Sequence, residues 1–99
     1  MSTQTTNSNV TVSTSSTQVV TATGREQRQL LVLSNDSDET IYLAIGGTAE
    51  MNKGIRLGVG ATFIFDKSFK EESLNSAVNA ICASGSKVLC IHERYLDQL

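Results

Sequence analysis

Short segments in which apolar and polar residues alternate recur along this chain, and turn-forming residues separate them. NVTVSTS at residues 9–15 shows this pattern, and so does TIYLAIGG, where Ile41, Leu43 and Ile45 share one face and Tyr42 and Ala44 the other. A period of two residues is typical of a half-buried strand. QLLVLSN at residues 29–35 differs, because it is a continuous apolar run that ends in Asn. We expect the main strands at residues 10–15, 27–35, 40–46, 61–65, 77–83 and 87–93.

Glycine and serine residues predict where these strands turn. Gly58-Val59-Gly60 is expected to join two short strands within GIRLGVGATFIFD (residues 54–66), because glycine supplies the positive φ of tight hairpin turns. Ser84-Gly85-Ser86 likewise predicts a final hairpin. The only helical candidate is SFKEESLNSA (68–77), for which we expect one turn. About eight short strands at this spacing predict an all-β fold, an antiparallel two-sheet β-sandwich that is jelly-roll-like.

The polar N-terminal segment sets the expected division of the chain. With 99 residues the chain fits one domain. The first 23 residues carry no charged side chain, and more than half of them are Ser or Thr. We expect residues 1–9 to be an extended N-terminal arm, 10–94 the β-sandwich domain and 95–99 a C-terminal tail. Since the arm has almost no apolar anchor, we expect another molecule to order it, and its deletion to leave the melting temperature nearly unchanged.

Charge and hydropathy exclude some classes of partner. The net charge of −2 argues against nucleic acid, since phosphate binding requires clustered Lys and Arg. No apolar stretch approaches the roughly 20 residues of a membrane span, so no membrane partner is expected. The N-terminus has neither the basic start nor the apolar core of a secretory signal, which predicts synthesis in a cytosol.

The residues capable of nucleophilic chemistry are few. His92 and Cys90 share one strand face, but no orienting Asp or Asn is indicated, so we expect no enzymatic activity. A hairpin centred on Ser86 places Cys82 directly opposite Cys90, within reach of a disulfide. The other reading is a pair of buried thiols, which a reducing cytosol favours.

The acidic and glycine-rich loops offer little to an ion or a cofactor. Asp36, Asp38 and Glu39 lie in one loop, but the Gly and bidentate Glu of a calcium loop do not follow at the right spacing. GIRLGVG lacks the Lys-Ser/Thr and the helix of a phosphate-binding loop. We expect no metal and no cofactor, with a Ca²⁺ site at the acidic loop as the remote alternative.

Four segments within residues 10–93 form a recurring pattern and read LLVLSNDS, IYLAIGGTA, GIRLGVGATFIF and AVNAICASGSKVLCIHE. In this order they resemble the small β-sandwich structural proteins of tailed bacteriophages, which include capsid decoration (cement) proteins and head-fibre or tail-associated modules. The KEESLNSA segment and the ERYLDQL tail depart from the shared pattern, so they leave the position in the virion open.

The resemblance implies a virion protein on the capsid surface, made in the host cytoplasm, that binds the major capsid protein as a homotrimer and stabilises the head shell. We expect contacts to the capsid or to neighbouring subunits from the two termini. The residues are Thr3, Gln4, Thr5, Thr6, Asn7, Tyr95, Leu96 and Leu99.

Two other functions stay open. One is a receptor- or carbohydrate-binding module of a phage fibre or spike, and the other is a non-viral oligomeric sandwich. Sugar-binding modules usually display exposed aromatic rings. This chain has no Trp, and its only tyrosines are Tyr42 and Tyr95, which disfavours the first alternative.

Overall fold

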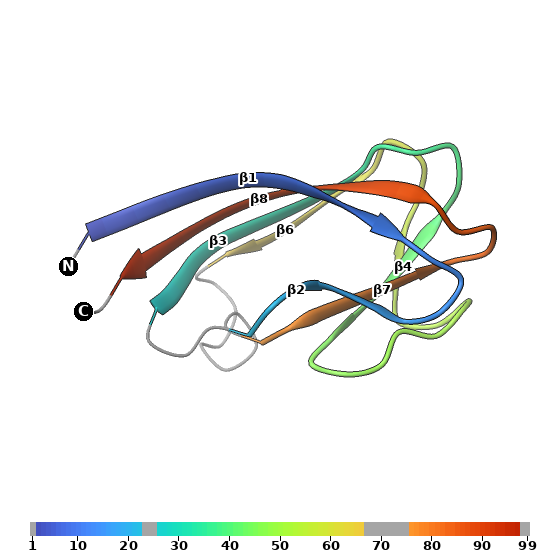
Figure 1. Ribbon diagram of the computed structural model, residues 1–99, viewed down its shortest axis with the longest axis horizontal. Coiled ribbons are helices and arrows are strands. Elements are labelled where there is room, and N and C mark those ends of the chain that lie inside the picture. Colours follow the sequence, from blue (N-terminus) through green and yellow to red (C-terminus); the bar gives the residue numbers. More distant parts are fainter. Residues whose placement is uncertain (1, 23–25, 67–75, 98–99) are drawn as a thin grey trace.

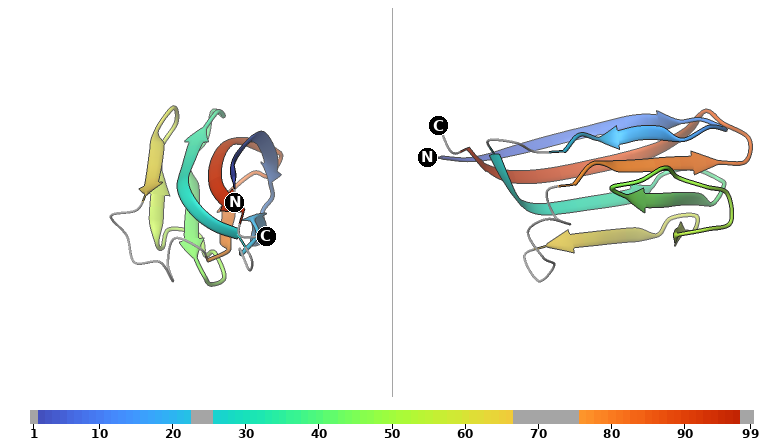
Figure 2. Two further views of the ribbon diagram at one scale, coloured as in Figure 1. Left: turned by 90° about the vertical axis from the view of Figure 1, so that its left-hand side faces the viewer. Right: turned by 90° about the horizontal axis from the view of Figure 1, so that it is seen from below.

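Two four-stranded antiparallel sheets make up the fold (Figures 1 and 2). The computed structural model describes residues 2–22, 26–66 and 76–97. The strand order is β1-β8-β3-β6 in one sheet, called sheet A, and β2-β7-β4-β5 in the other, sheet B. The strands are β1 (Ser2–Val12), β2 (Thr17–Val20), β3 (Glu26–Asn35), β4 (Ile41–Ile45), β5 (Ile55–Leu57), β6 (Thr62–Asp66), β7 (Val78–Cys82) and β8 (Lys87–Asp97).

The strand pairs are nested around the centre of the sequence. β4 pairs with β5, β3 with β6, β2 with β7 and β1 with β8, so each pair encloses the one before it. Of the consecutive strands, only β4 and β5 share a sheet, and every other connection crosses between the sheets. The expected all-β, antiparallel two-sheet sandwich is confirmed, and its nested order is jelly-roll-like.

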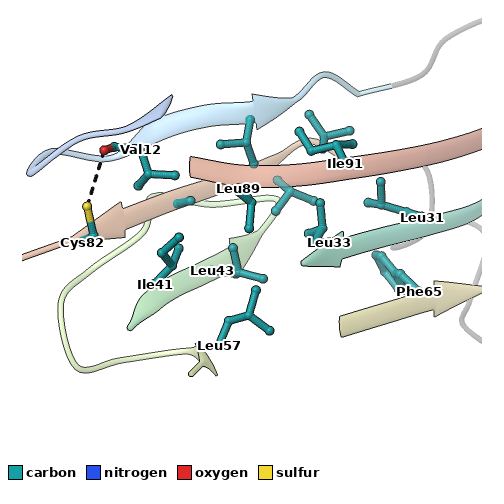
Figure 3. Close-up of a cluster of buried hydrophobic side chains, with 14 residues drawn as sticks. Val12, Leu31, Leu33, Ile41, Leu43, Leu57, Phe65, Cys82, Leu89 and Ile91 are labelled. Atoms are coloured by element: carbon teal, nitrogen blue, oxygen red, sulfur yellow. Dashed lines mark hydrogen bonds between the residues drawn. The ribbon is translucent and has the colours of Figure 1, made fainter. Parts of the chain in front are cut away.

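Alternate residues of the strands fill the space between the sheets. Leu31 and Leu33 from sheet A meet Ile41 and Leu43 from sheet B, and all four are fully buried or nearly so (Figure 3). Phe65 joins them from β6 and packs against Phe63, with ring centroids 5.8 Å apart. Each such side chain stabilises the fold by roughly 1.5–3 kcal/mol when fully buried. The alternation seen in the sequence therefore defines the core.

Two predicted hairpins are wrong, because their strands lie in different sheets. β7 belongs to sheet B and β8 to sheet A, and likewise β5 and β6 are divided between the sheets. At the β7–β8 connection Gly85 and Ser86 both have positive φ, +77° and +55°. These residues turn the chain as predicted, but the turn carries it across the core instead of back along its own sheet. A turn signal alone does not distinguish the two outcomes.

The cysteines are consequently not neighbours. Cys82 pairs with Ile41 in sheet B and is fully buried, with its sulfur 3.4 Å from the carbonyl oxygen of Val12 (Figure 3). Cys90 pairs with Asn9 in sheet A and is half-buried. Both are free thiols, so the cross-strand geometry that brought a disulfide within reach is wrong.

The N-terminal segment is ordered by the chain itself. β1 begins at Ser2 and pairs without interruption with β8, from Ser2 opposite Asp97 to Val12 opposite Lys87. The expectation that another molecule must order residues 1–9 is therefore wrong, because the C-terminal strand supplies the main-chain partners. Residues 95–97 of the expected tail belong to the same ladder. The predicted helical turn at 68–77 lies almost wholly outside the described residues.

The start of β1 and the end of β8 lie together at one end of an elongated molecule of 41 × 22 × 20 Å (Figure 1). β1 and β8 reach that end side by side, beyond the end of β2 (Figure 1). Among the described residues no helix is long and apolar enough to cross a membrane.

Candidate assembly surface

The predicted contact residues of the two termini lie together in one ribbon. We call residues 3–9 of β1 and 90–96 of β8 the terminal ribbon. Thr3 is opposite Leu96 and Gln4 is opposite Tyr95, while Thr5, Thr6 and Asn7 continue the ladder toward His92. The sequence presented these residues as two separate surfaces, because no local pattern reveals that the first and last strands pair. Leu99 lies outside the described residues.

β1 is an edge strand, since β8 flanks it on one side only. Its side chains from Thr3 to Asn9 are all exposed. The strand contains no charged residue and no proline, and its register with β8 has no bulge. Proteins usually protect their edge strands with charges, proline, bulges or short length. β1 has none of these protections along its eleven residues.

The other three edges of the two sheets are better protected. β2 has four residues and a bulge between Gln18 and Val20. β5 has three residues, with Arg56 in the middle. β6 has five residues and ends in Asp66. Among the strands that the structure describes, β1 is therefore the edge most open to another strand.

The open edge presents main-chain groups to a partner. In an antiparallel ladder the N–H and C=O of alternate residues point away from the paired strand. Over the length of β1, roughly five or six residues direct both groups outward. An added strand can bind such a row by main-chain hydrogen bonds, while the exposed side chains determine selectivity.

Arg28 connects the terminal ribbon, at Glu93, to the segments that flank sheet B. Its side chain is fully buried, and its Nε donates to Oε2 of Glu93 on β8 at 2.7 Å. Its two terminal nitrogens donate to the carbonyl oxygens of Ser76 at 2.8 Å and Thr21 at 2.7 Å, which flank β7 and β2 of sheet B. Sequence reasoning missed this residue, because a charged residue at the start of a strand usually faces solvent.

Polar and apolar side chains are distributed unevenly over the two strands of the terminal ribbon. Tyr95 shares the inner face with Glu93, whereas Leu96 lies on the outer face with Arg94, and both Tyr95 and Leu96 are half-buried. His92 is also on the outer face, where its Nδ1 is hydrogen-bonded to Oδ1 of Asn7. The ribbon is thus polar along β1 and mixed along β8.

The candidate nucleophile and base have separate partners. His92 bonds Asn7, while Sγ of Cys90 lies 3.9 Å from a carboxylate oxygen of Asp36. Cys90 and His92 do share one face of β8, as predicted, but no hydrogen bond between them is observed in this part of the structure.

The acidic loop at residues 36–39 contacts the β7–β8 connection through an ion pair and a hydrogen bond. Oδ1 of Asp38 is 2.7 Å from Nζ of Lys87, and Glu39 accepts the backbone N–H of Ser84 at 2.7 Å. The hydrogen bond from Lys87, with its charge, lowers the pKa of Asp38, and hydrogen bonds from Ser84 lower the pKa of Glu39. Within residues 2–22, 26–66 and 76–97, no three His, Cys, Asp or Glu side chains are grouped to hold a metal ion.

Comparison with known proteins gives a likeness of fold. No family model and no curated protein matches the sequence. A solved structure from Bacillus endospore appendages, described as disulfide-linked pili, is similar over 96% of this chain and 87% of its own, with 11% identity and a TM-score of 0.59.

Two virus structures are similar at lower scores. The cyanophage Pam1 capsid matches over 95% of this chain and 84% of its own, with 11% identity and a TM-score of 0.46. The Tobacco streak virus coat protein matches over 94% of this chain and 86% of its own, with 10% identity and a TM-score of 0.44. At such identities, the appendage structure establishes a shared β-sandwich fold and does not assign a function.

Proposed function

We propose that this chain is a structural subunit of a phage virion, a decoration protein that binds the major capsid protein on the capsid surface. The observation that carries this proposal is the edge of β1, which has eleven residues and no charge, proline or bulge. Such an edge accepts a strand of a capsid subunit and extends sheet A by one strand. The resemblance of four sequence segments to phage structural proteins supports the same role.

The binding energy of one such edge is modest. Each main-chain hydrogen bond contributes a net of about 0.5–1.5 kcal/mol, because both groups also bond water in the free state. Many copies on a symmetric shell act together, so that weak single contacts add up to firm attachment. Stabilisation of the shell follows from this multiplicity.

The proposed role is non-catalytic. The support for this is geometric: Sγ of Cys90 lies near Asp36 and His92 is hydrogen-bonded to Asn7, while no hydrogen bond joins Cys90 to His92 among the described residues. A receptor- or carbohydrate-binding role has less support. Tyr42 and Tyr95 are both half-buried, so neither presents the fully exposed ring that such modules usually stack on a sugar.

A proline pair tests the role of the β1 edge. Consecutive residues of β1 direct their N–H groups to opposite sides, one toward β8 and the next outward. Of the variants Thr5→Pro and Thr6→Pro, one removes a hydrogen bond to β8 and is expected to melt at a lower temperature. The other removes an outward N–H, and it is expected to melt close to the unmodified protein yet to bind capsids more weakly.

Binding is measured by co-sedimentation with capsids prepared without this protein. Thr48→Pro, in the exposed loop after β4, is the control for a proline away from the edge. If both β1 variants bind capsids as tightly as the unmodified protein, attachment does not use this edge and the proposed role of β1 is wrong. The homotrimer implied by the resemblance stays a prediction, which a mass of three chains in solution would support and a mass of only one or two chains would contradict.

A further inference from the structure

The outer face of sheet A has an apolar centre. Because Leu31, Leu33 and Phe65 point into the core, their neighbours Leu30, Val32 and Ile64 point outward. The side chain of Ile64 is 55% exposed, and Leu30 and Val32 are half-buried. The continuous apolar run of β3 therefore places apolar residues on both faces of the sheet. That pattern is typical of strands that are covered on both sides.

Charged residues flank this centre in a regular arrangement. Leu30 on β3 is opposite Arg94 on β8 and also opposite Asp66 on β6, so the three residues form one row across the sheet. In the next row Val32 lies between His92 and Ile64. We call these two rows the outer patch. In the first row the cation Arg94 lies on one side of β3 and the anion Asp66 on the other, each one strand spacing of about 4.8 Å away.

This arrangement is complementary to itself. We place a second copy face to face on the outer patch, related to the first by a twofold axis that runs along β3. The β8 strand of the second copy then lies above β6 of the first, and its β6 lies above β8 of the first. Arg94 then faces Asp66 of the partner subunit, and the reverse contact forms on the other side of the axis. Leu30 and Val32 lie at the axis and meet their own counterparts. A carboxylate accepts more than one donor, so Asp66 can bind this cation beside any contact within its own subunit.

From this register we propose that a second copy of the chain covers the outer patch in a twofold, face-to-face pair. Such an interface is isologous, since the same surface serves both subunits. Sheets pack face to face about 10 Å apart, a gap that apolar side chains of this size fill. Both charged residues lie within one strand of the axis, so the twist between packed sheets displaces them little.

The area of the face sets the expected affinity. Because the axis runs along β3, only β8, β3 and β6 of each copy overlap with the partner, and from strand spacing and rise they cover roughly 300–400 Å² per copy. A pair therefore buries on the order of 600–800 Å² in total, which is the size of a weak, transient interface. Dissociation constants toward the upper end of the micromolar range are expected, and the pairing has to be sought at high protein concentration.

The pairing does not rest on the proposed function, because it involves this chain alone. One consequence does rest on it. With the axis along β3, the β1 edges of the two copies lie on opposite sides of the pair. A pair therefore offers two edges to a shell.

Sedimentation velocity and light scattering of the purified chain, from about 1 µM to about 1 mM, test the pairing. The mass is expected to rise from one chain to two. Ile64→Lys is expected to raise the dissociation constant at least about tenfold, because it places a charge in the apolar centre. Val59→Lys is the matched control, since Val59 is 61% exposed in the β5–β6 connection and lies outside the outer patch.

A charge exchange adds a second, independent readout. Arg94→Asp and Asp66→Arg each place like charges opposite one another and are expected to weaken the pair. The double variant restores opposite charges and is expected to recover most of the affinity. Thermal melting of each variant establishes that it is folded.

Three results would each overturn the pairing. They are a mass of one chain across the whole range, a mass of three chains, and an Ile64→Lys or charge-exchange series that leaves the dissociation constant unchanged. A failure here leaves the proposed attachment through β1 standing, because that is measured separately with capsids.

Discussion

Arg28 and Asn35, at opposite ends of β3, are the buried polar residues among those described. Each donates hydrogen bonds to backbone carbonyl oxygens at strand ends and connections. Arg28 donates to the carbonyl oxygens of Thr21 and Ser76. Asn35 donates to those of Glu39, after β3, and Leu57, at the end of β5. Buried polar groups are costly unless they are paired, so both residues specify how the connections close the sandwich.

Replacement of Arg28 is expected to destabilise the fold strongly. Arg28→Met leaves Glu93 and two carbonyl oxygens without their donor, and breaking a buried pair in this way costs about 3 kcal/mol or more. For a chain of this size each kcal/mol corresponds to roughly 4–8 °C in melting temperature. Lys53→Met is the control, since Lys53 and Glu50 are exposed and 3.9 Å apart, and it is expected to change stability by less than about 0.5 kcal/mol. A loss below about 1 kcal/mol for Arg28→Met would contradict this account of the Arg28 contacts.

Asn35 can be tested by a nearly isosteric change. Its Nδ2 donates to the carbonyl oxygens of Glu39 at 2.7 Å, Leu57 at 2.9 Å and Gly58 at 3.1 Å. In Asn35→Asp a carboxyl group faces these oxygens, and their repulsion, with burial, raises its pKa above that of the unfolded chain. The variant is therefore least stable at neutral pH and regains stability as the pH falls through the raised pKa.

Urea unfolding of Asn35→Asp at pH 7 and pH 5 measures this dependence. The exposed Asn52, in the turn before β5, provides the control Asn52→Asp, which is expected to show little pH dependence. Equal stability of Asn35→Asp at both pH values would show that the three carbonyl contacts do not hold in solution.

At the scale of elements, β1 and β8 form one ladder but contribute differently. Side chains of β1 from Thr3 to Asn9 are exposed, whereas β8 supplies the buried Leu89 and Ile91 and lies between β1 and β3. Loss of the first strand removes an edge, while loss of the last strand divides sheet A.

A pair of truncations tests this difference. Deletion of residues 1–8 removes ladder hydrogen bonds, but it also removes the entropy cost of ordering those residues, so the two largely offset. The melting temperature is expected to fall by only a few degrees. Deletion of residues 90–99 is expected to prevent folding, as seen in circular dichroism and in the dispersion of amide resonances. A folded product of the second deletion would contradict the strand order.

The β3–β4 and β7–β8 connections are joined by charge. The pKa of Asp38 is lowered by its hydrogen bond from Lys87, and that of Lys87 is raised by the same bond. The contribution of Asp38 is present above its unfolded pKa, near 4, and is lost as the pH falls through its lower folded value. The contribution of Lys87 is present below about pH 10 and is lost as the pH rises through its folded value.

Titration by NMR checks this contact. In Lys87→Met the pKa of Asp38 is expected to return toward its ordinary value. High salt is expected to move the pKa of Asp38 in the same direction in the unmodified protein, because salt screens a contact near the surface. An unchanged Asp38 titration in the variant would show that the two side chains do not interact in solution.

At the scale of the whole molecule, the nested pairs join residues that are far apart in sequence. Ser2 pairs with Asp97, and such non-local pairing predicts folding in milliseconds to seconds. The chain contains no proline, so no slow isomerisation phase of tens of seconds is expected. Stopped-flow refolding after short and long incubation in denaturant should give the same single phase. A slow phase that grows with incubation time would contradict this expectation.

Local pattern determined much of this fold. Alternation placed strands near their observed positions, for instance 41–45 against the expected 40–46 and 62–66 against 61–65. It also identified core residues such as Ile41 and Leu43, because a period of two residues reflects burial of one face. The uncharged Thr- and Ser-rich N-terminus predicted an extended segment, and residues 2–12 do form a strand.

Partner choice was decided only by the tertiary structure. Ser84-Gly85-Ser86 indicated a turn, but the turn crosses between sheets, because burying two apolar faces against each other outweighs pairing with the nearest strand. Thr3 pairs with Leu96, and Arg28 is buried between the sheets. Both features depend on residues far away in the sequence. Periodicity reports which face of a strand is buried, whereas the identity of its neighbour depends on how the whole chain closes around its core.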